Sequence, residues 1–371
     1  MTKIPFFTLS RQQDKLDKEI GSAIERVLKS GRFIGGEEVE AFEREFCEWL
    51  GAKYAVSVAC GFDAIKLSLM ALGVGIGDEV ITSANGCPAT PMAIKAAGAT
   101  PVFVDCNDHD VMEPAKIEKA ISKRTKAVVP VHLYGMPCDM SAIMRVARAH
   151  KIKVVEDCAQ AHGTIWKGKK AGVFGDVGCF SFYPTKNLGA LGDAGMAVTA
   201  SKKIADKIRR LANYGEVERF NSAFFGVNSR MDALQAAVLR EKLKYLEYFI
   251  SRRRHIAGRY YEKLSRLNIK LPSAPPNGVH AFHLYVVHLK DRDIVMKKLQ
   301  KAGVGCDVHY PIPLHLLGAF SEGRYKKGDF PKAEESAETA LSLPMYPELS
   351  DGDVDFVVDA LRKAVGGVSG N

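Results

Sequence analysis

Residues 156–195 read EDCAQAHGTIWKGKKAGVFGDVGCFSFYPTKNLGALGDAG, and the fold can be worked out from this stretch. The apolar run at 152–155 leads into it and predicts a buried strand that ends on the carboxylate of Asp157. A second apolar run, at 177–182, predicts another strand, which is followed by Lys186. The sequence therefore places an acid at the end of one strand and a lysine beyond the end of another, 29 residues later.

This pair of residues is what pyridoxal phosphate (PLP) chemistry requires. The cofactor aldehyde forms a Schiff base with a lysine amine, which Lys186 would supply. The pyridine nitrogen needs a carboxylate beside it, here Asp157, because an opposite charge favours the protonated ring. The protonated ring is the electron sink that stabilises a carbanion at the substrate carbon. Each residue alone is also compatible with a surface lysine and an ordinary strand-end aspartate, so the spacing by itself leaves both interpretations open.

Length and composition exclude several classes of protein. The chain has 371 residues, enough for two domains, and its 47% hydrophobic and 26% charged residues are typical of globular proteins. No apolar run approaches the roughly 20 residues that span a membrane, and the first residues become charged too soon for a signal peptide. The eight cysteines form no CxxC pair and no zinc-type cluster, so we expect a reducing cytoplasm, no disulfides and no metal. The net charge of +9 fits an anionic substrate, and no nucleic-acid-binding motif accompanies it.

Strands alternate with helices along the first two thirds of the chain. Helical stripes are expected at 11–30 and 37–50, and βα units follow them. This alternation predicts an α/β fold with a mostly parallel, doubly wound sheet. From about residue 250 the pattern changes to a strand at 282–289, a helix at 294–302, a strand at 304–309 and a helix at 354–365. We therefore expect a large domain at 1–248, which includes the N-terminal helices, and a small α+β domain at 249–371.

Several long phrases resemble the signatures of one family. They are EDCAQAHG and GDVGCFSFYPTKNLGALGDAG in the stretch above, GRFIGGEEVEAFEREF from residue 31, and GVNSRMDALQAAVLREKL from residue 226. The family is that of the DegT/StrS-type sugar aminotransferases, which are PLP-dependent transferases of fold type I. The resemblance extends from about Gly31 to Leu361 and implies that fold, in a homodimer with active sites at the interface. It also implies transfer of an amino group from glutamate or glutamine to a keto group of a nucleotide-linked sugar.

The resemblance also implies roles for individual residues. Lys186 would hold PLP and act as the general base and acid, with Asp157 at the ring nitrogen. The other implied cofactor contacts are Gly61 and Phe62 at a phosphate-binding helix start, Cys87 near the ring, Gln160 at the ring hydroxyl, Ser181 at the phosphate, and Asn228 crossing to the phosphate of the partner subunit. Two of these positions depart from the family pattern. Phe62 replaces a threonine that is common in the family. Cys87 replaces an aromatic residue that stacks on the cofactor ring, so another side chain would have to cover that ring.

On the substrate side, the candidates are His162, Tyr183, His309 and Tyr310, and the segment 132–135 after a further strand is equally compatible with a crevice wall or a plain turn. The turn at 213–215 and the HYPIPLH segment from residue 309 look more like enzymes that aminate the third carbon of the sugar than the fourth. Amination of a 4-keto sugar remains the alternative. A sugar dehydratase is disfavoured because that branch typically replaces the lysine by histidine or adds a cysteine-ligated cluster. A non-catalytic regulatory homologue is disfavoured because the implied site residues are intact.

Overall fold

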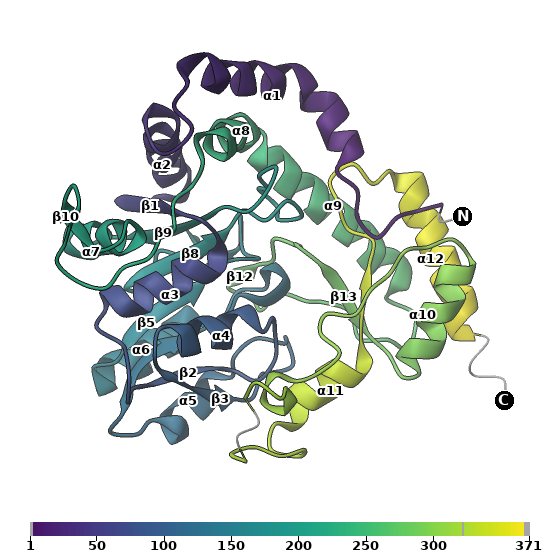
Figure 1. The fold of residues 1–371 in the computed structure, drawn as a ribbon. Helices are drawn as coiled ribbons and strands as arrows, with labels where there is room; N and C mark the ends of the chain where they lie inside the picture. Colours follow the sequence, from purple (N-terminus) through teal and green to yellow (C-terminus); the bar gives the residue numbers. More distant parts are fainter. Residues whose placement is uncertain (1–2, 321–322, 367–371) are drawn as a thin grey trace.

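The centre of the molecule is a seven-stranded sheet with the order β1-β9-β8-β5-β4-β2-β3. It is seen in a computed structural model that describes residues 3–320 and 323–366 (Figure 1). Its strands are β1 (Tyr54–Val58), β2 (Glu79–Ser83), β3 (Thr100–Val104), β4 (Thr125–Val129), β5 (Lys153–Asp157), β8 (Val177–Ser181) and β9 (Gly195–Thr199). The strands β8, β5, β4, β2 and β3 are parallel, and β9 runs antiparallel to both of its neighbours, β1 and β8. The prediction of a mostly parallel sheet is confirmed.

Helices cover both faces of this sheet. The apolar side chains of α3, α4 and α7 form one buried cluster with β1, β2, β5 and β8, including Val155. Those of α2, α5, α6 and α8 cover the other face, where Val154 points. The helices of this half are α1 (Ser10–Ser30), α2 (Glu37–Leu50), α3 (Gly61–Ala71), α4 (Ala89–Ala96), α5 (Pro114–Ala120), α6 (Met140–His150), α7 (Lys202–Ala212) and α8 (Ala233–Leu243). Because Val154 and Val155 face opposite helices, Asp157 points toward α3 and Glu156 points away from it.

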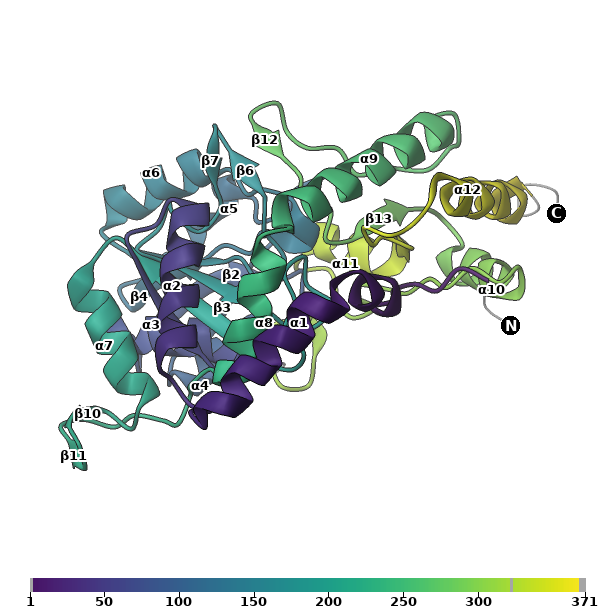
Figure 2. The same ribbon diagram turned by 90° about the horizontal axis from the view of Figure 1, so that it is seen from above.

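The first two helices match the predicted ranges closely. The N–H of Gly31 bonds to the carbonyl of Leu28, and its φ of 64° ends α1, because glycine adopts this left-handed conformation without strain. Glycines at 35 and 36, also at positive φ, then turn the chain into α2. Figure 2 shows α1 running from α8 toward the C-terminal part, so it lies along both halves of the molecule.

The second half of the molecule has its own buried cluster, built from α9, β13, α10, β14 and α12. Its elements are α9 (Leu246–Leu264), β13 (Tyr285–His288), α10 (Arg292–Lys301), α11 (Pro331–Thr339), β14 (Ala340–Leu343) and α12 (Asp351–Gly366). Ile4 also packs in this cluster, although the predicted division assigns it to the large domain. That division, at 248/249, falls just inside α9 and stays a prediction.

One expected strand, at 304–309, is absent from the structure. This segment makes only single bridges, from Val304 to Ile4 and from Asp307 to Ser342. Gly305 explains the difference, because it approaches the N-terminal segment so closely that a Cβ there would lie 2.4 Å from the backbone nitrogen of Phe6. The segment therefore touches the edge of the small sheet only at the bridge from Asp307 to Ser342 and does not extend it as a further strand.

The remaining elements are short. They are β6 (Ile165–Trp166), β7 (Lys169–Lys170), β10 (Glu216–Glu218), β11 (Asn221–Ser222), β12 (Gly278–Val279) and the 3-10 turns η1 (Leu133–Gly135) and η2 (Leu314–Leu316). Strands β10 and β11 form a hairpin that projects from the body of the molecule (Figure 2). Within the described ranges, no helix combines the length and the apolar character that crossing a bilayer requires.

Candidate active site

Asp157 lies at the carboxyl end of β5, and both of its oxygens are held. Oδ2 accepts a hydrogen bond from the hydroxyl of Thr90 at 2.6 Å, and Oδ1 accepts one from the N–H of Ala159 at 3.0 Å. The side chain is 5% exposed. Donors to both oxygens fix the direction of the carboxylate at the edge of the sheet, where ligands of such folds bind.

Lys186 follows β8, the strand that pairs with β5. Asp157 is opposite Cys179 in this pairing, so the turn that begins after β8 starts next to the carboxylate. Burial lowers the pKa of Lys186 below its ordinary value, while the nearby thiol of Cys87 and carboxylate of Asp157 oppose that shift. The amine, the thiol and the acid are thus electrostatic neighbours in one site. A depressed pKa increases the neutral fraction of the amine, which is the form that acts as a nucleophile and base.

The turn that carries Lys186 is held from below by α8. Lys242 donates to the carbonyl of Gly189 at 2.9 Å, and the side-chain oxygen of Gln235 accepts from the N–H of Leu191 at 2.8 Å. Lys242 is buried, and burial lowers its pKa to about 8. Gly189 has no space for a side chain, because a Cβ would lie 2.2 Å from the carbonyl oxygen of Pro184. These contacts keep the turn in one conformation.

The start of α3 is the candidate cradle for an anion. Helix α3 begins at Gly61 and has no side-chain cap, and a Cβ on Gly61 would lie 2.6 Å from the Cβ of Ser181. The partly buried Phe62 packs into the core beneath, so the position contributes only its backbone N–H. The helix dipole and the uncapped first turn favour a phosphate here. The hydroxyl of Ser229 donates to Asp63 at 2.7 Å and so ties the segment around Asn228 to this turn.

Gln160 has its amide orientation fixed by the backbone. Its Oε1 accepts from the N–H of Tyr134 at 2.6 Å, and its Nε2 donates to the hydroxyl of Tyr310 at 3.1 Å. Burial raises the pKa of Tyr310 well above its usual range, and the adjacent thiol of Cys87 adds to this rise. Gln160, Cys87 and Tyr310 therefore meet at one point, although they come from three distant parts of the chain.

The other predicted substrate residues have different surroundings. Tyr183 is 51% exposed, and His309 bonds through Nδ1 to the hydroxyl of Ser342 at 2.9 Å. His162, in contrast, is fully buried, and neither of its ring nitrogens has a hydrogen-bond partner within the described chain. It is packed against the rings of Phe46, Phe180 and Phe182. The structure thus leaves Tyr183 exposed and His309 and Tyr310 partly exposed, whereas His162 is enclosed in the core and is not placed to contact a substrate.

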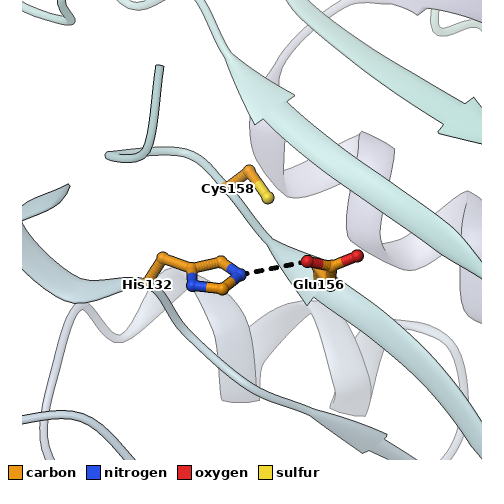
Figure 3. Close-up of side chains that lie close together, drawn as sticks. All are labelled: His132, Glu156 and Cys158. Atoms are coloured by element: carbon orange, nitrogen blue, oxygen red, sulfur yellow. Dashed lines mark hydrogen bonds and ion pairs between the residues drawn. The ribbon is translucent and has the colours of Figure 1, made fainter. Parts of the chain in front are cut away.

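A buried group of His132, Glu156 and Cys158 has the composition of a metal site (Figure 3). Four N–H groups donate to the two oxygens of Glu156: those of Gly172 (2.9 Å), Phe174 (2.7 Å) and Gly175 (2.8 Å), and Nε2 of His132 (3.1 Å). Nδ1 of His132 accepts from the N–H of Cys138 at 3.1 Å. The carboxylate oxygens and both imidazole nitrogens are therefore already used in hydrogen bonds. These hydrogen bonds anchor β5 to the neighbouring loops on the face away from α3, and they leave His132 and Glu156 without free atoms to bind a metal.

The chain is similar to known proteins over nearly its whole length. Residues 14–362 match the model of the DegT/DnrJ/EryC1/StrS aminotransferase family. The chain belongs to this family. It is 44% identical to a dTDP-3-amino-3,6-dideoxy-alpha-D-galactopyranose transaminase of Aneurinibacillus thermoaerophilus, over 97% of this chain and 99% of that protein.

Solved structures of family members superimpose closely on this chain. DesV of Streptomyces venezuelae, solved with a ketimine intermediate, has a TM-score of 0.96 at 41% identity, and the match covers 98% of both chains. NtdA of Bacillus subtilis, solved with the cofactor PMP, has a TM-score of 0.92 at 34% identity and is matched over 99% of this chain and 86% of its own. The expected fold, that of the PLP-dependent aminotransferases, is confirmed.

Two residues of the site were not assigned a role from the sequence. Thr90 is the hydroxyl partner of Asp157, and His283 lies near Lys186, where burial lowers its pKa far below the ordinary value and the charge of Lys186 lowers it further. Nδ1 of His283 is buried without a hydrogen-bond partner among the described residues. Thr90 lies in the first turn of α4, at the end of the loop that follows β2, and this position was a usable signal. No local pattern around His283 indicated that it would lie near Lys186.

Proposed function

We propose that this chain is a PLP-dependent aminotransferase that moves an amino group from glutamate or glutamine to a 3-keto group of a nucleotide-linked sugar. The observation that carries the proposal is that the partly buried Lys186 and Asp157 are electrostatic neighbours at the ends of two paired strands. The site fits the cofactor in three respects: a lysine of lowered pKa, a carboxylate with both oxygens fixed, and an uncapped helix start at Gly61 that leaves no room for a side chain.

In the proposed reaction each residue has a separate task. The bound cofactor supplies an electron sink for the carbanion formed at the substrate carbon. Asp157 would keep a proton on the ring nitrogen, because a negative charge beside the ring favours the protonated form. The N–H groups at the start of α3 and the hydroxyl of Ser181 would hold the phosphate. Lys186 would take a proton from the α-carbon of the donor and pass it to the aldehyde carbon of the cofactor in the first half-reaction. In the second half-reaction it would move a proton from that carbon to the keto carbon of the sugar.

Support for the third carbon comes from the HYPIPLH segment and from the named activity of the relative from Aneurinibacillus thermoaerophilus. His309 and Tyr310 begin that segment and lie beside the site, so we propose that they, with Tyr183, contact the sugar. Turnover of matched 3-keto and 4-keto nucleotide sugars with glutamate tests the position. Faster reaction of the 4-keto member would overturn it without affecting the aminotransferase proposal.

The direct test of the proposal is the replacement Lys186→Ala. The purified wild-type protein supplied with PLP is expected to show a visible absorbance band, and Lys186→Ala is expected to lose both the band and turnover. Lys202→Ala is the matched control, because Lys202 is an exposed lysine of α7 that pairs only with Asp206 among the described residues. Retained turnover in Lys186→Ala would refute the assigned role.

We further propose a homodimer in which Asn228 acts at the phosphate of the other subunit. Asn228 is exposed in the single chain, close to the projecting hairpin where Phe220 and Phe225 are 84% and 80% exposed. Exposed aromatic side chains of this kind favour burial in a subunit interface.

Complementation tests the shared site. Lys186→Ala and Asn228→Asp are each expected to be inactive, and a mixed dimer of the two contains one site with both wild-type residues. Co-expression should therefore restore turnover. Absence of recovery in a mixed dimer of confirmed composition would show that Asn228 acts in its own chain.

We also propose a cytoplasmic location for the reaction. All eight cysteines are free thiols, and most of them are buried, as is common for proteins of reducing compartments. Alkylation of the denatured protein in freshly lysed cells should modify all eight thiols, and a disulfide would contradict the proposal.

A further inference from the structure

The amide of Gln160 has one N–H group that the surrounding protein does not use. Oε1 is occupied by the backbone N–H of Tyr134, so Nε2 must point the other way and carries two protons. One of these is donated to the hydroxyl of Tyr310 at 3.1 Å. The second N–H is directed by the first, because the amide is planar and both of its ends are held.

Tyr310 is itself held at this point. The hydroxyl of Tyr134 donates to the carbonyl of His309, which ties the loop before Tyr310 to the large half of the molecule. The titratable groups around the Tyr310 hydroxyl are Cys87 on the loop after β2 and Asp157 at the end of β5, and Tyr134 lies close by. Tyr310 stays protonated in this environment, so its oxygen accepts from Gln160 while its own proton points elsewhere.

The position of Gln160 relative to the cofactor follows from the shape of the pyridine ring. In PLP the ring nitrogen is opposite the carbon that bears the aldehyde, and the phosphate arm and the hydroxyl flank that carbon on its two sides. With Asp157 at the nitrogen, Lys186 at the aldehyde and the start of α3 at the phosphate, the hydroxyl must face the remaining side. Gln160 offers its free N–H there. This step rests on the proposed function.

We propose that Tyr310 is a positioning residue, which accepts one N–H of Gln160 and thereby aims the other at the ring hydroxyl of the cofactor. The tyrosine hydroxyl lies next to the thiol of Cys87. An N–H donated to that oxygen stabilises negative charge on it. It therefore favours loss of the proton that the oxygen shares with the lysine nitrogen of the loaded protein.

The experiment is a pH titration of the visible absorbance of the PLP-loaded protein. Tyr310→Phe keeps the ring but removes the acceptor, so the midpoint of the absorbance change should move upward by about one pH unit, the size of one hydrogen bond. Gln160→Ala should raise the midpoint by at least as much. In the double variant, Tyr310→Phe should add nothing, because its effect passes through the missing amide.

Tyr285→Phe is the matched control, since that hydroxyl is buried without a partner in the described structure and its loss should leave the midpoint unchanged. An unchanged midpoint in Tyr310→Phe would overturn the positioning role. The same would follow if Tyr310→Phe shifted the midpoint equally in the wild-type protein and in Gln160→Ala. Failure of the wild-type protein to develop any visible band would instead refute PLP binding itself. The two failures are therefore distinguishable in one titration.

Discussion

Adjacent carboxylates in β5 have different roles because neighbouring residues of a strand point to opposite faces. Asp157 points toward α3, where two donors leave room for a ligand at the sheet edge. Glu156 points to the other face, where four donors satisfy it completely and bind the loop at 172–175 to the strand. One acid is thus available to the site, and the other fixes the strand that presents it.

Asp157→Asn should preserve the fold but reduce turnover. The amide keeps the shape of the side chain and loses its charge, so the ring nitrogen is protonated roughly ten- to a thousandfold less at neutral pH. The visible band of the loaded protein should remain, because Lys186 is intact. Steady-state kinetics measure the effect, and Asp206→Asn on the exposed face of α7 is the control. Unchanged turnover would remove Asp157 from the chemistry.

Glu156→Gln should reduce stability. The new NH2 group must face at least one of the N–H donors that the carboxylate accepts, which leaves a buried donor unpaired and costs about 1–3 kcal/mol. Urea unfolding of the variant and the wild type measures the loss. Zinc added to the wild-type protein should not raise its melting temperature, since His132 and Glu156 are already bonded. A large zinc-dependent rise would contradict the hydrogen-bonded interpretation of Figure 3.

At the scale of elements, the site is made where two turns touch. The turn from β1 into α3 and the end of β8 are in contact, because Gly61 packs directly on Ser181. Gly195, at the start of β9, lies behind the same turn, and a Cβ there would come within 2.3 Å of the carbonyl carbon of Cys60. Glycine is therefore required on two segments to let three strand ends converge.

Gly61→Ala should weaken PLP binding more than it harms the rest of the protein. The added methyl overlaps Ser181 and must push the start of α3 away from the phosphate, at a cost of about 1–3 kcal/mol. A lower affinity for PLP, by roughly tenfold or more, should follow from that displacement and is measurable by absorbance titration. Gly75→Ala is the matched control, because a methyl group there would meet nothing within 4 Å beyond its chain neighbours. Equal affinities would show that the cradle tolerates movement.

Local sequence pattern predicted the elements and the residues next to them. Apolar runs located β5 and β8, and the side chains at or just beyond their ends, Asp157 and Lys186, were found with them. The bond from Thr90 to Asp157 and the approach of His283 to Lys186 join segments far apart in the chain, and periodicity carries no information about such contacts. The prediction of a strand at 304–309 was wrong for the same reason, because Gly305 packs against an N-terminal segment that is distant in the sequence.

At the scale of the whole molecule, both halves bury neutral histidines. Burial lowers the pKa of His162 to about 3, with a smaller contribution from the charge of Lys186. The pKa of His280 is also lowered to about 3, first by burial and then by Arg254, and its Nδ1 accepts from the N–H of Phe282 at 2.8 Å. The folded protein therefore resists protonation at positions where the unfolded chain accepts it.

Stability should fall as the medium becomes acidic, starting near the ordinary histidine pKa. Because the folded-state values are depressed, the unfolded chain binds more protons between pH about 6.5 and 3, and each histidine contributes a slope of ~1.4 kcal/mol per pH unit in that window. The variant His162→Phe, whose ring should fit among three phenylalanines, removes one of the groups that the unfolded chain protonates in this window. Urea unfolding at pH 7, 6 and 5 should show a shallower slope for the variant. Identical slopes would mean that His162 is already protonated in the folded protein.

The order of the strands also has a consequence for synthesis on the ribosome. Strand β1 leads directly into α3 and the phosphate cradle, yet it lies at the border of the sheet, and its neighbour there is β9, which pairs Tyr54 with Thr199. A nascent chain must therefore emerge through Thr199 before its first strand is secured. If the start of α3 binds the cofactor phosphate as proposed, a chain that ends before Thr199 lacks the strand that holds this site in place, and it should not retain PLP.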